Sequence, residues 1–368
     1  MTHRPNADAV VVGASLAGLM TALGLSQAGY PATVLERTGP APRSGAALGN
    51  ATSGLQRILS GRNGTSGNGV DAYAPNAVAE TWEQTYRLLR AATNDDANIR
   101  VLHNQVVAHV GQNDDHAWAR TADGTVHEGE LLVGADGHRS VVRRLVAPDK
   151  PDATYAGYVI WLGIAEESEL DVAAIGRRWP SGLDIRDAGP DCLLGYPLGP
   201  HDGSLGGGRR LGWAWFDPRR THLLRETGCV AGDVVQHSMR PADVPANTLA
   251  ELDDEARQWP SPWREAIRDC LRRRAVTGTP IAEYLPDRLT SGRVALVGDA
   301  GHVSTPMTGR GFAVAVSDAE TLAEELAKHP AGTGILTALH AYEQRRLGPA
   351  RDVVTSGQAF SRSFKLST

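Results

Sequence analysis

Three apolar segments follow one another at the start of the chain. Residues 8–12 form a short run rich in valine, which is typical of a strand covered on both faces. Residues 19–28 form a helical pattern that ends at Gly29, and residues 31–35 return to a strand pattern that ends at Glu36. This order predicts a strand–helix–strand unit of a parallel α/β sheet.

The pattern of a strand followed by a polar turn returns twice. An apolar run at 131–133 leads into Gly134-Ala135-Asp136, and another at 294–297 leads into Gly298-Asp299. A helix is predicted after the second turn, over residues 312–328. The carboxyl ends of parallel strands meet at one edge of a sheet, and ligands bind at that edge. We therefore expect these two turns to lie beside the turn that follows residue 12.

The parallel pattern fades between residues 151 and 278. Strands are predicted at 155–165, 193–197 and 210–216, and the last of them alternates apolar residues. The predicted fold class is α/β: a Rossmann-like domain, an inserted domain of mixed β-sheet and helices, and a C-terminal helix. The predicted boundaries are 1–150 and 279–330 for the Rossmann-like domain, 151–278 for the inserted domain, and 331–368 for the C-terminal helical segment.

Two further segments have a distinctive composition. Residues 50–80 are predicted to form a flexible loop, because Gly, Ser and Asn dominate much of the stretch. Both a mobile lid and a loose surface loop suit that composition. A C-terminal helix is predicted over 341–360, with a kink or break at Gly348-Pro349.

Composition narrows the function classes. The 368 residues carry 37 Lys+Arg and 42 Asp+Glu, and no dense basic run indicates a nucleic-acid partner. The three cysteines lie far apart and the 12 histidines show no metal-binding spacing, so we predict neither a disulfide framework nor a metal site. The apolar stretch 9–25 is interpreted as strand and helix, not as a signal peptide, and no other segment suits a membrane span. We expect a cytoplasmic protein, either a monomer or a homodimer.

The turn after residue 12 has the spacing of a dinucleotide-binding site. It reads Gly13-x-Ser15-x-x-Gly18, and Glu36 follows 23 positions after Gly13. Gly13 permits a tight turn, a small residue at 15 lets the backbone approach a pyrophosphate, and Gly18 lets the helix pack closely on the strand. The helix N-terminus then faces the phosphate charge, and the carboxylate suits a ribose hydroxyl. We predict nucleotide binding here.

Three motifs together resemble those of one enzyme family. They are Gly13-x-Ser15-x-x-Gly18 with Glu36, the stretch Gly134–Arg143, and Gly298–His302 with Pro306 and Gly309-x-Gly311. Their order and spacing are similar to the three signatures of the class A flavoprotein monooxygenases, the para-hydroxybenzoate hydroxylase-like enzymes. The stretches 155–161 and 209–216 are similar to the 2,6-dihydroxypyridine hydroxylase-like branch, with Gly212 in place of an asparagine.

The resemblance implies a para-hydroxybenzoate hydroxylase-type fold with FAD as its cofactor. Gly13, Ser15, Leu16 and Gly18 would hold the pyrophosphate. The other implied contacts are Glu36 on the adenosine ribose, Arg37 and Val107 beside the adenine, Arg43 near the ribityl chain or flavin ring, Asp136 in the motif linked to FAD support and transient NAD(P)H binding, Asp299 at the ribityl or pyrophosphate region, and backbone N–H groups of Gly309, Gly311 and Phe312 along the flavin pyrimidine ring.

The inserted sheet would cover the flavin and form the substrate pocket. The resemblance places Pro306 over the flavin edge that carries oxygen. Tyr196 and His302 are candidates to keep a bound substrate electron-rich, although His302 also suits a packed residue that orders its turn. Trp213 and Trp215 share one face of their strand by alternation. Either they stack on a planar substrate or they fill a core between sheet and helix.

The implied reaction is a hydroxylation. NADPH or NADH would reduce FAD, and reduced flavin with O2 would give a C4a-hydroperoxide that hydroxylates an aromatic or N-heterocyclic small molecule. Epoxidation, dehydrogenation and oxidative decarboxylation stay open as alternatives on the same fold. A FAD-binding accessory protein without turnover is a further alternative.

Overall fold

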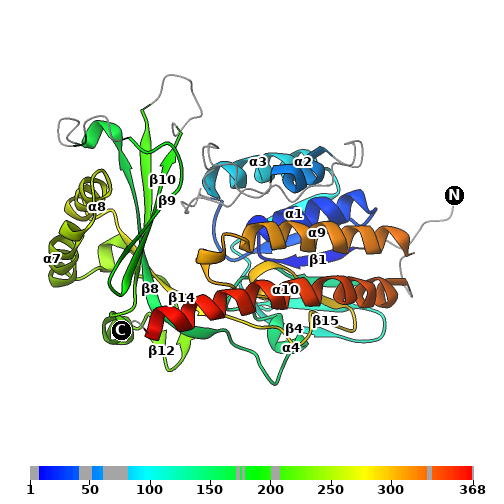
Figure 1. The fold of residues 1–368 in the computed structure, drawn as a ribbon. Coiled ribbons are helices and arrows are strands. Elements are labelled where there is room, and N and C mark those ends of the chain that lie inside the picture. Colours follow the sequence, from blue (N-terminus) through cyan, green and yellow to red (C-terminus); the bar gives the residue numbers. More distant parts are fainter. Residues whose placement is uncertain are drawn as a thin grey trace.

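Two large β-sheets with helices packed on them form the body of the described structure, and one long C-terminal helix spans both (Figure 1). This computed structural model describes residues 8–40, 52–60, 82–170, 175, 179–199, 208–329 and 334–366. In the described part of the chain, no helix is both long and apolar enough to cross a membrane.

The first sheet has the strand order β15–β16–β7–β1–β2–β3. Its strands are β1 (Ala9–Val12), β2 (Ala32–Glu36), β3 (Ile99–His103), β7 (Leu131–Gly134), β15 (Thr290–Ser291) and β16 (Val294–Leu296). All neighbours are parallel except β15, which is antiparallel to β16. Every residue of β1 and β7 is buried, which explains their continuous apolar sequence.

Helices cover one face of this sheet and a small sheet with a short helix covers the other. The helical layer holds α1 (Leu16–Gln27), α2 (Thr52–Ser60), α3 (Trp82–Asp95) and α9 (Gly311–Lys328). Most of α1 is apolar and buried, since it packs between the sheet and α9 (Figure 1). The opposite layer holds β4 (Val107–Gln112), β5 (Ala117–Thr121), β6 (Val126–Gly129) and α4 (Arg143–Val146).

The second sheet is antiparallel and has the order β14–β8–β11–β10–β9. Its strands are β8 (Thr154–Glu166), β9 (Asp184–Ala188), β10 (Asp191–Leu198), β11 (Arg210–Asp217) and β14 (Thr277–Glu283). One face packs against α7 (Ala246–Glu255) and α8 (Trp263–Arg272), and the other faces the first sheet's body (Figure 1). Side chains therefore alternate between a helix-facing core and a face turned toward the first body.

Short elements complete the described structure. They are α6 (Thr221–Glu226), the pair β12 (Val230–Ala231) and β13 (Val234–Val235), and the 3₁₀ turns η2 (Glu167–Glu169), η3 (Pro241–Asp243), η4 (Ala256–Gln258), η5 (Gly298–Ala300) and η6 (Pro306–Thr308). The last helix, α10 (Gly334–Leu366), starts beside α9 and ends at the second sheet (Figure 1).

The α/β fold class is confirmed, and three local predictions need correction. The boundary predicted at 278/279 falls inside β14, which belongs to the second sheet as far as Glu283. Helix α2 occupies part of the segment predicted as a loop, while residues 61–80 lie outside the described part. Of the kink or break predicted at Gly348-Pro349, the break is wrong, because helix α10 continues through Pro349.

Candidate functional site

The ends of four parallel strands meet at one edge of the first sheet. Val12 of β1 pairs with Leu35 of β2 and with Gly134 of β7, and Gly134 pairs in turn with Leu296 of β16. The turns that follow these strands are therefore level with one another. The chain leaves β1 toward β2 and leaves β7 toward β16, in opposite directions, and the crevice between two such strands is where open α/β sheets bind ligands.

The first and second turns touch at Gly13. Gly13 has φ 103°, and a Cβ at this position would lie 2.4 Å from the carbonyl oxygen of Ala135. Its N–H donates to the carbonyl of Leu35 at 2.8 Å. A side chain at position 13 would therefore force apart the turn after β1 and the turn after β7.

Buried Arg143 joins the second turn to the third. Its Nη1 donates to the carbonyl of Ala300 at 3.1 Å, and its Nη2 donates to the carbonyl of His138. The guanidinium also lies 4.3 Å from the ring centre of Tyr284, within the range of a cation–π contact. The third turn reaches the first as well, since a Cβ at Gly298 would lie 2.9 Å from the Cβ of Ala17.

Two helix N-termini open onto this edge. Ser15 precedes α1 and Arg310 precedes α9, and neither side chain caps the helix that follows. The first turn of each helix contains no acidic residue. Uncapped N-termini carry a partial positive charge and free N–H groups, so this edge suits an anionic ligand such as the pyrophosphate of a dinucleotide.

The carboxylate of Glu36 joins the end of β2 to the turn after β1. It is buried at the end of β2, and its Oε2 accepts from the backbone N–H of Ala14 at 2.9 Å. The Thr38 N–H donates to Oε1 at 2.9 Å. Arg37 beside it is exposed. The backbone N–H of Gln105 donates to the Glu36 carbonyl at 2.8 Å, which brings the segment leading to Val107 to this strand end.

The two aspartates of the later turns have different surroundings. Asp136 accepts from the Ser140 hydroxyl at 2.5 Å and from the Val141 N–H at 2.7 Å, so its carboxylate orders its own turn. Burial raises the pKa of Asp136 despite these bonds. Asp299 is exposed at the third turn. Desolvation by the surrounding protein raises the pKa of its carboxyl, and the charges of His302, His138 and Arg143 oppose this rise.

One buried ring nitrogen in this region has no hydrogen-bond partner within the described part of the chain. It is Nε2 of His138, in the second turn, beside the Asp299 carboxylate that acts on its pKa. Burial lowers the pKa of His138, which favours the neutral imidazole. An unsatisfied ring nitrogen at a strand-end crevice is consistent with a polar ligand there.

His302 faces the protein interior. It is 2% exposed, and its Nε2 lies 2.6 Å from Oδ2 of Asp318 in α9. The same oxygen accepts from the Gly298 N–H at 3.0 Å, and Arg346 of α10 donates to Oδ1 at 2.8 Å. Of the two roles considered from sequence, this geometry matches the packed residue that orders the third turn. It corrects the inclusion of His302 among the residues that act on substrate.

The turn that carries Pro306 is closed by its own backbone. The Gly309 N–H donates to the Pro306 carbonyl at 2.9 Å. The prediction that this N–H is directed at a ligand is therefore wrong. Pro306 itself is exposed, at the start of η6. Gly311 is the first residue of α9, and Phe312 is half-buried against the core of the first sheet's helical layer. Arg43 lies outside the described residues.

Trp213 and Trp215 lie on the side of the second sheet away from the strand-end crevice. Both are 0% exposed, and Trp215 meets Trp259 edge to face at 5.7 Å between ring centres. They belong to the core between the sheet and α8. The prediction that Trp213 and Trp215 share one face of their strand is confirmed, but that face is the one covered by helices. This corrects their prediction as substrate residues.

Tyr196 lies on the opposite face of the same sheet. Alternation along β10 puts it with Cys192 and Leu194, which belong to the apolar cluster that faces the first body. A Cβ at Gly212, the residue paired with Tyr196 on β11, would lie 2.1 Å from Cε2 of the tyrosine. The glycine at 212, where the related branch has asparagine, therefore makes room for the ring.

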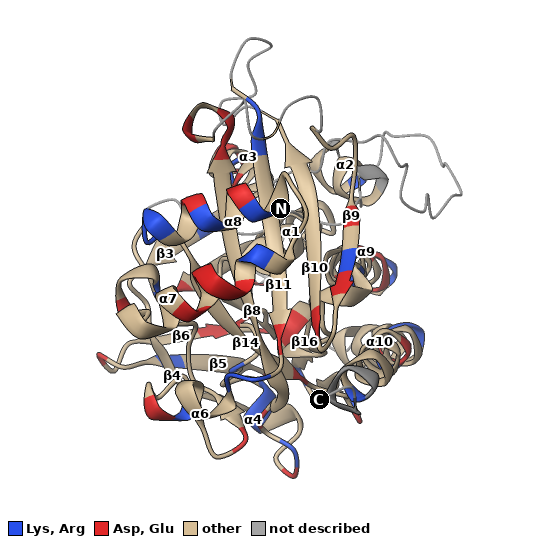
Figure 2. Ribbon diagram, turned by 60° about the vertical axis from the view of Figure 1, so that its left-hand side comes forward, with Lys and Arg blue, Asp and Glu red and all other residues tan. Residues whose placement is uncertain are grey.

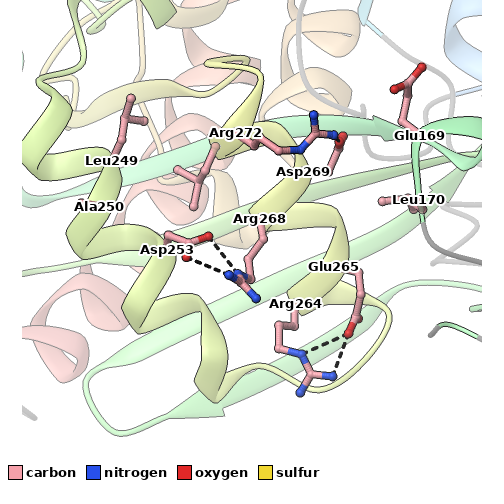
Figure 3. A pocket seen from close by; sticks show the side chains of 11 residues that line it. Glu169, Leu170, Leu249, Ala250, Asp253, Arg264, Glu265, Arg268, Asp269 and Arg272 are labelled. Atoms are coloured by element: carbon pink, nitrogen blue, oxygen red, sulfur yellow. Dashed lines mark hydrogen bonds and ion pairs between the residues drawn. The ribbon is translucent and has the colours of Figure 1, made fainter.

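A separate groove of about 560 Å³ lies between α7 and α8. Figure 3 shows two ion pairs in this groove, Arg268 with Asp253 and Arg264 with Glu265. The charged residues of α7 are all acidic, whereas α8 carries both signs of charge (Figure 2). The groove is on the helix-covered side of the second sheet, remote from the strand-end turns, so it plays no part in the site.

Comparisons with known proteins agree with this geometry. The family described as FAD binding domain matches residues 264–356. The chain is 28% identical to 2,6-dihydroxypyridine 3-monooxygenase of Paenarthrobacter nicotinovorans, over 93% of this chain and 88% of that protein. It is 26% identical to the FAD-dependent urate hydroxylase of Klebsiella pneumoniae, over 94% and 87% of the two chains. The solved structure of 2,6-dihydroxypyridine-3-hydroxylase from Arthrobacter nicotinovorans superposes with a TM-score of 0.80 at 23% identity, over 98% and 93% of the two chains.

Along almost its whole length the chain is similar to FAD-dependent monooxygenases of the class A flavoprotein type. It is an FAD-dependent monooxygenase, and the strand-end crevice fits that cofactor. The fit is a matter of shape and charge: a turn that tolerates no Cβ at Gly13, two uncapped helix N-termini, and polar groups at Glu36, His138 and Asp299.

Sequence reasoning missed several residues that build this monooxygenase site. Arg143 was recognised only as a motif letter, and Asp318 and Arg346 were not considered. A signal for Asp318 existed: it interrupts the apolar stripe of α9 between Val314 and Leu322, so a buried partner was to be expected. No local signal pointed to Arg346, since its partner comes from another helix.

Proposed function

We propose that this monooxygenase hydroxylates a planar, electron-rich aromatic or N-heterocyclic small molecule, with NADPH or NADH as electron donor and O2 as the oxygen source. The observation that carries the proposal is the apolar face of the second sheet. It is turned toward the strand-end crevice and the Pro306 turn. The named substrates of the relatives, a dihydroxypyridine and urate, support the same class.

The proposed substrate surface combines three parts of the chain. Leu162 and Leu194 of the sheet are half-buried, and both pack on the apolar cluster that contains Phe216. Met307 of η6 and Phe360 of α10 reach the same cluster. Flat apolar walls suit an aromatic ring, and the hydroxyl of Tyr196 offers one polar contact by which a phenol or lactam would be oriented.

Bound FAD would supply the redox chemistry, accepting a hydride from NAD(P)H and activating O2 so that one oxygen atom enters the substrate. Ser15 and Leu16, at the N-terminus of α1, would bind the pyrophosphate, and Glu36 would bind the adenosine ribose. Asp299 would bind the ribityl chain. The N-terminus of α9 at Gly311 would stabilise negative charge on the reduced ring.

The remaining assignments stay proposals. Pro306 would lie over the flavin edge, Arg37 and Val107 beside the adenine, and Phe312 near the ring. We propose a FAD-binding part made of residues 1–150 and 284–330, with the boundary moved to the end of β14. The three cysteines are all buried and unpaired, which supports a cytoplasmic location. We further propose that the protein is a monomer or a homodimer.

The test of this function is NAD(P)H oxidation across a panel of hydroxylated aromatics and N-heterocycles, with labelled O2 and product mass. We expect oxidation to accelerate with a suitable ring and the product to gain one labelled oxygen. Leu194→Trp, which fills the substrate face, should raise KM about tenfold or more and keep FAD bound. Leu336→Trp, at an exposed site on α10, is the matched control. A product that has lost two hydrogens and gained no oxygen would replace hydroxylation by dehydrogenation.

A further inference from the structure

A chain of buried hydroxyl groups joins the second sheet to the turn that carries Pro306. Tyr158 of β8 is 0% exposed, and its hydroxyl is hydrogen-bonded to the hydroxyl of Thr305. On the other side, Oγ of Ser361 lies 3.5 Å from the Tyr158 oxygen. Ser361, near the end of α10, also donates to Oε1 of Glu283 in β14 at 2.5 Å. Four elements distant in sequence thus meet through polar side chains.

Thr305 is the point where this chain reaches the Pro306 turn. Its Oγ1 accepts from the Met307 N–H at 3.5 Å, which makes Thr305 the N-cap of η6. Its carbonyl accepts from the Thr308 hydroxyl at 3.0 Å. Whatever holds the Thr305 side chain therefore also sets the position of η6 and of Pro306.

Helix α10 packs directly against Thr305. A Cβ at Gly357 would lie 2.8 Å from Cγ2 of Thr305, so the helix backbone rests directly on that side chain. Three residues further along α10, Phe360 meets Phe216 of the sheet edge to face at 6.1 Å between ring centres. The end of α10 is thus wedged between the substrate face and the Pro306 turn.

The hydroxyl of Tyr158 has no packing role that a phenylalanine ring would lack. Its ring stacks on Phe216 at 6.0 Å between centres, and that contact does not involve the oxygen. Burial raises the pKa of Tyr158 to about 12, so the phenol stays neutral and serves as a fixed hydrogen-bonding group. An oxygen in such an apolar setting is retained only if its partners satisfy it.

We propose that Tyr158 is a positioning residue, which holds the Thr305 cap and so fixes the Pro306 turn against the substrate face, with Ser361 of α10 as its second support. The inference rests on the proposed function for its catalytic consequence. If the Pro306 turn were displaced from the substrate face, activated oxygen would be released as hydrogen peroxide instead of entering the substrate. Tyr158 would therefore govern the ratio of product formed to NAD(P)H consumed.

The test is Tyr158→Phe, with Tyr155→Phe as the matched control. Tyr155 is also buried on β8, but it faces the helix-covered core, where its hydroxyl lies 3.2 Å from that of Thr221. We expect Tyr158→Phe to lower the product-to-NAD(P)H ratio and to speed amide hydrogen exchange at Met307, each about fivefold, as one lost buried hydrogen bond supports. FAD affinity should stay unchanged, and Tyr155→Phe should match the wild type.

Two further variants separate the hydroxyl from general packing. Thr305→Ser keeps the hydroxyl that caps η6 and should keep the wild-type ratio of product to NAD(P)H. Thr305→Val lacks that hydroxyl and should behave like Tyr158→Phe. Unchanged exchange at Met307 in Tyr158→Phe, or an equal effect in Tyr155→Phe, would overturn the proposal. If the wild type binds FAD and forms no hydroxylated product, the proposed function fails, and the exchange measurement still decides the positioning role.

Discussion

Replacing Arg143 by methionine tests how firmly the second and third turns are joined. The change keeps a long apolar stem and removes the guanidinium, which donates to the carbonyls of Pro151 at 2.8 Å, of Ala300 at 3.1 Å and of His138. Each buried carbonyl that loses its donor costs about 1–3 kcal/mol. Burial lowers the pKa of Arg143, so its own desolvation penalty disappears with it and offsets part of the loss. We expect a net loss of about 3–5 kcal/mol in unfolding free energy.

Urea unfolding followed by circular dichroism measures the stability, and quenching of flavin fluorescence measures FAD binding. Because the two turns would no longer be tied, the FAD dissociation constant should rise about tenfold or more. Arg144→Met is the matched control: Arg144 is the next residue, pairs with Asp152 at 2.6 Å, and is 56% exposed. It should cost less than about 1 kcal/mol and leave FAD binding unchanged.

The loss expected for Arg143→Met is a large part of a typical total of about 5–15 kcal/mol. Arg143→Lys, which keeps the charge and part of the bonding, should fall between wild type and Arg143→Met if the latter does not fold. Unfolding free energies of Arg143→Met and Arg144→Met that agree within about 1 kcal/mol, with equal FAD affinity, would refute the reasoning.

Three further outcomes follow from the structure. Gly13→Ala should abolish FAD retention because its Cβ would lie 2.4 Å from the Ala135 carbonyl, whereas Gly29→Ala, also at positive φ but with nothing within 4 Å, should retain FAD in the same fluorescence titration. Burial opposes ionisation of Asp318, but His302 and Arg346 hold its pKa below the ordinary value. The ionised Asp318 therefore stabilises the folded chain fully above about pH 4, and this stabilisation is lost on acidification. The unfolding free energy of Asp318→Asn should fall less with acid than that of the wild type. Burial and the neighbouring Asp217 carboxylate raise the pKa of Asp191 to about 6. The folded chain therefore binds this proton more tightly than the unfolded chain does, and the unfolding free energy should decline as pH rises from about 4 to 6. Asp191→Asn should lack this decline in urea unfolding at successive pH values.

The strand-end crevice could be predicted from sequence because its information is local. Each turn follows an apolar strand that is buried on both faces, and parallel pairing leaves such turns only one edge to share. The positions of Gly13 and Glu36 relative to each other follow from the length of one strand–helix–strand unit. That is why these residues lie where the spacing placed them.

The second sheet could be predicted only in part, because alternation does not say which face meets which layer. The pattern correctly grouped Trp213 with Trp215. The choice between the helix-covered face and the substrate face depends on how α7 and α8, from a later part of the chain, pack on the sheet. Large apolar side chains fit either face, so their identity did not decide the matter.

Contacts between distant segments lay beyond sequence reasoning. Arg143 reaches a carbonyl 157 residues away, and Tyr158 reaches a hydroxyl 147 residues away. Backbone carbonyls carry no sequence signal at all, and a buried tyrosine has no visible partner until the fold brings one to it. His302 shows the same limit, since only the arrival of Asp318 distinguishes a packed imidazole from a reactive one.

The central claim, that three strand-end turns form a single flavin site, is tested most directly by titrating the folded protein with FAD. We predict saturable quenching of flavin fluorescence with one FAD bound per chain, and loss of that binding in Asp299→Ala while its circular dichroism remains that of the wild type. A properly folded wild-type protein that binds no FAD, or an Asp299→Ala variant that binds it as tightly as wild type, would contradict the account.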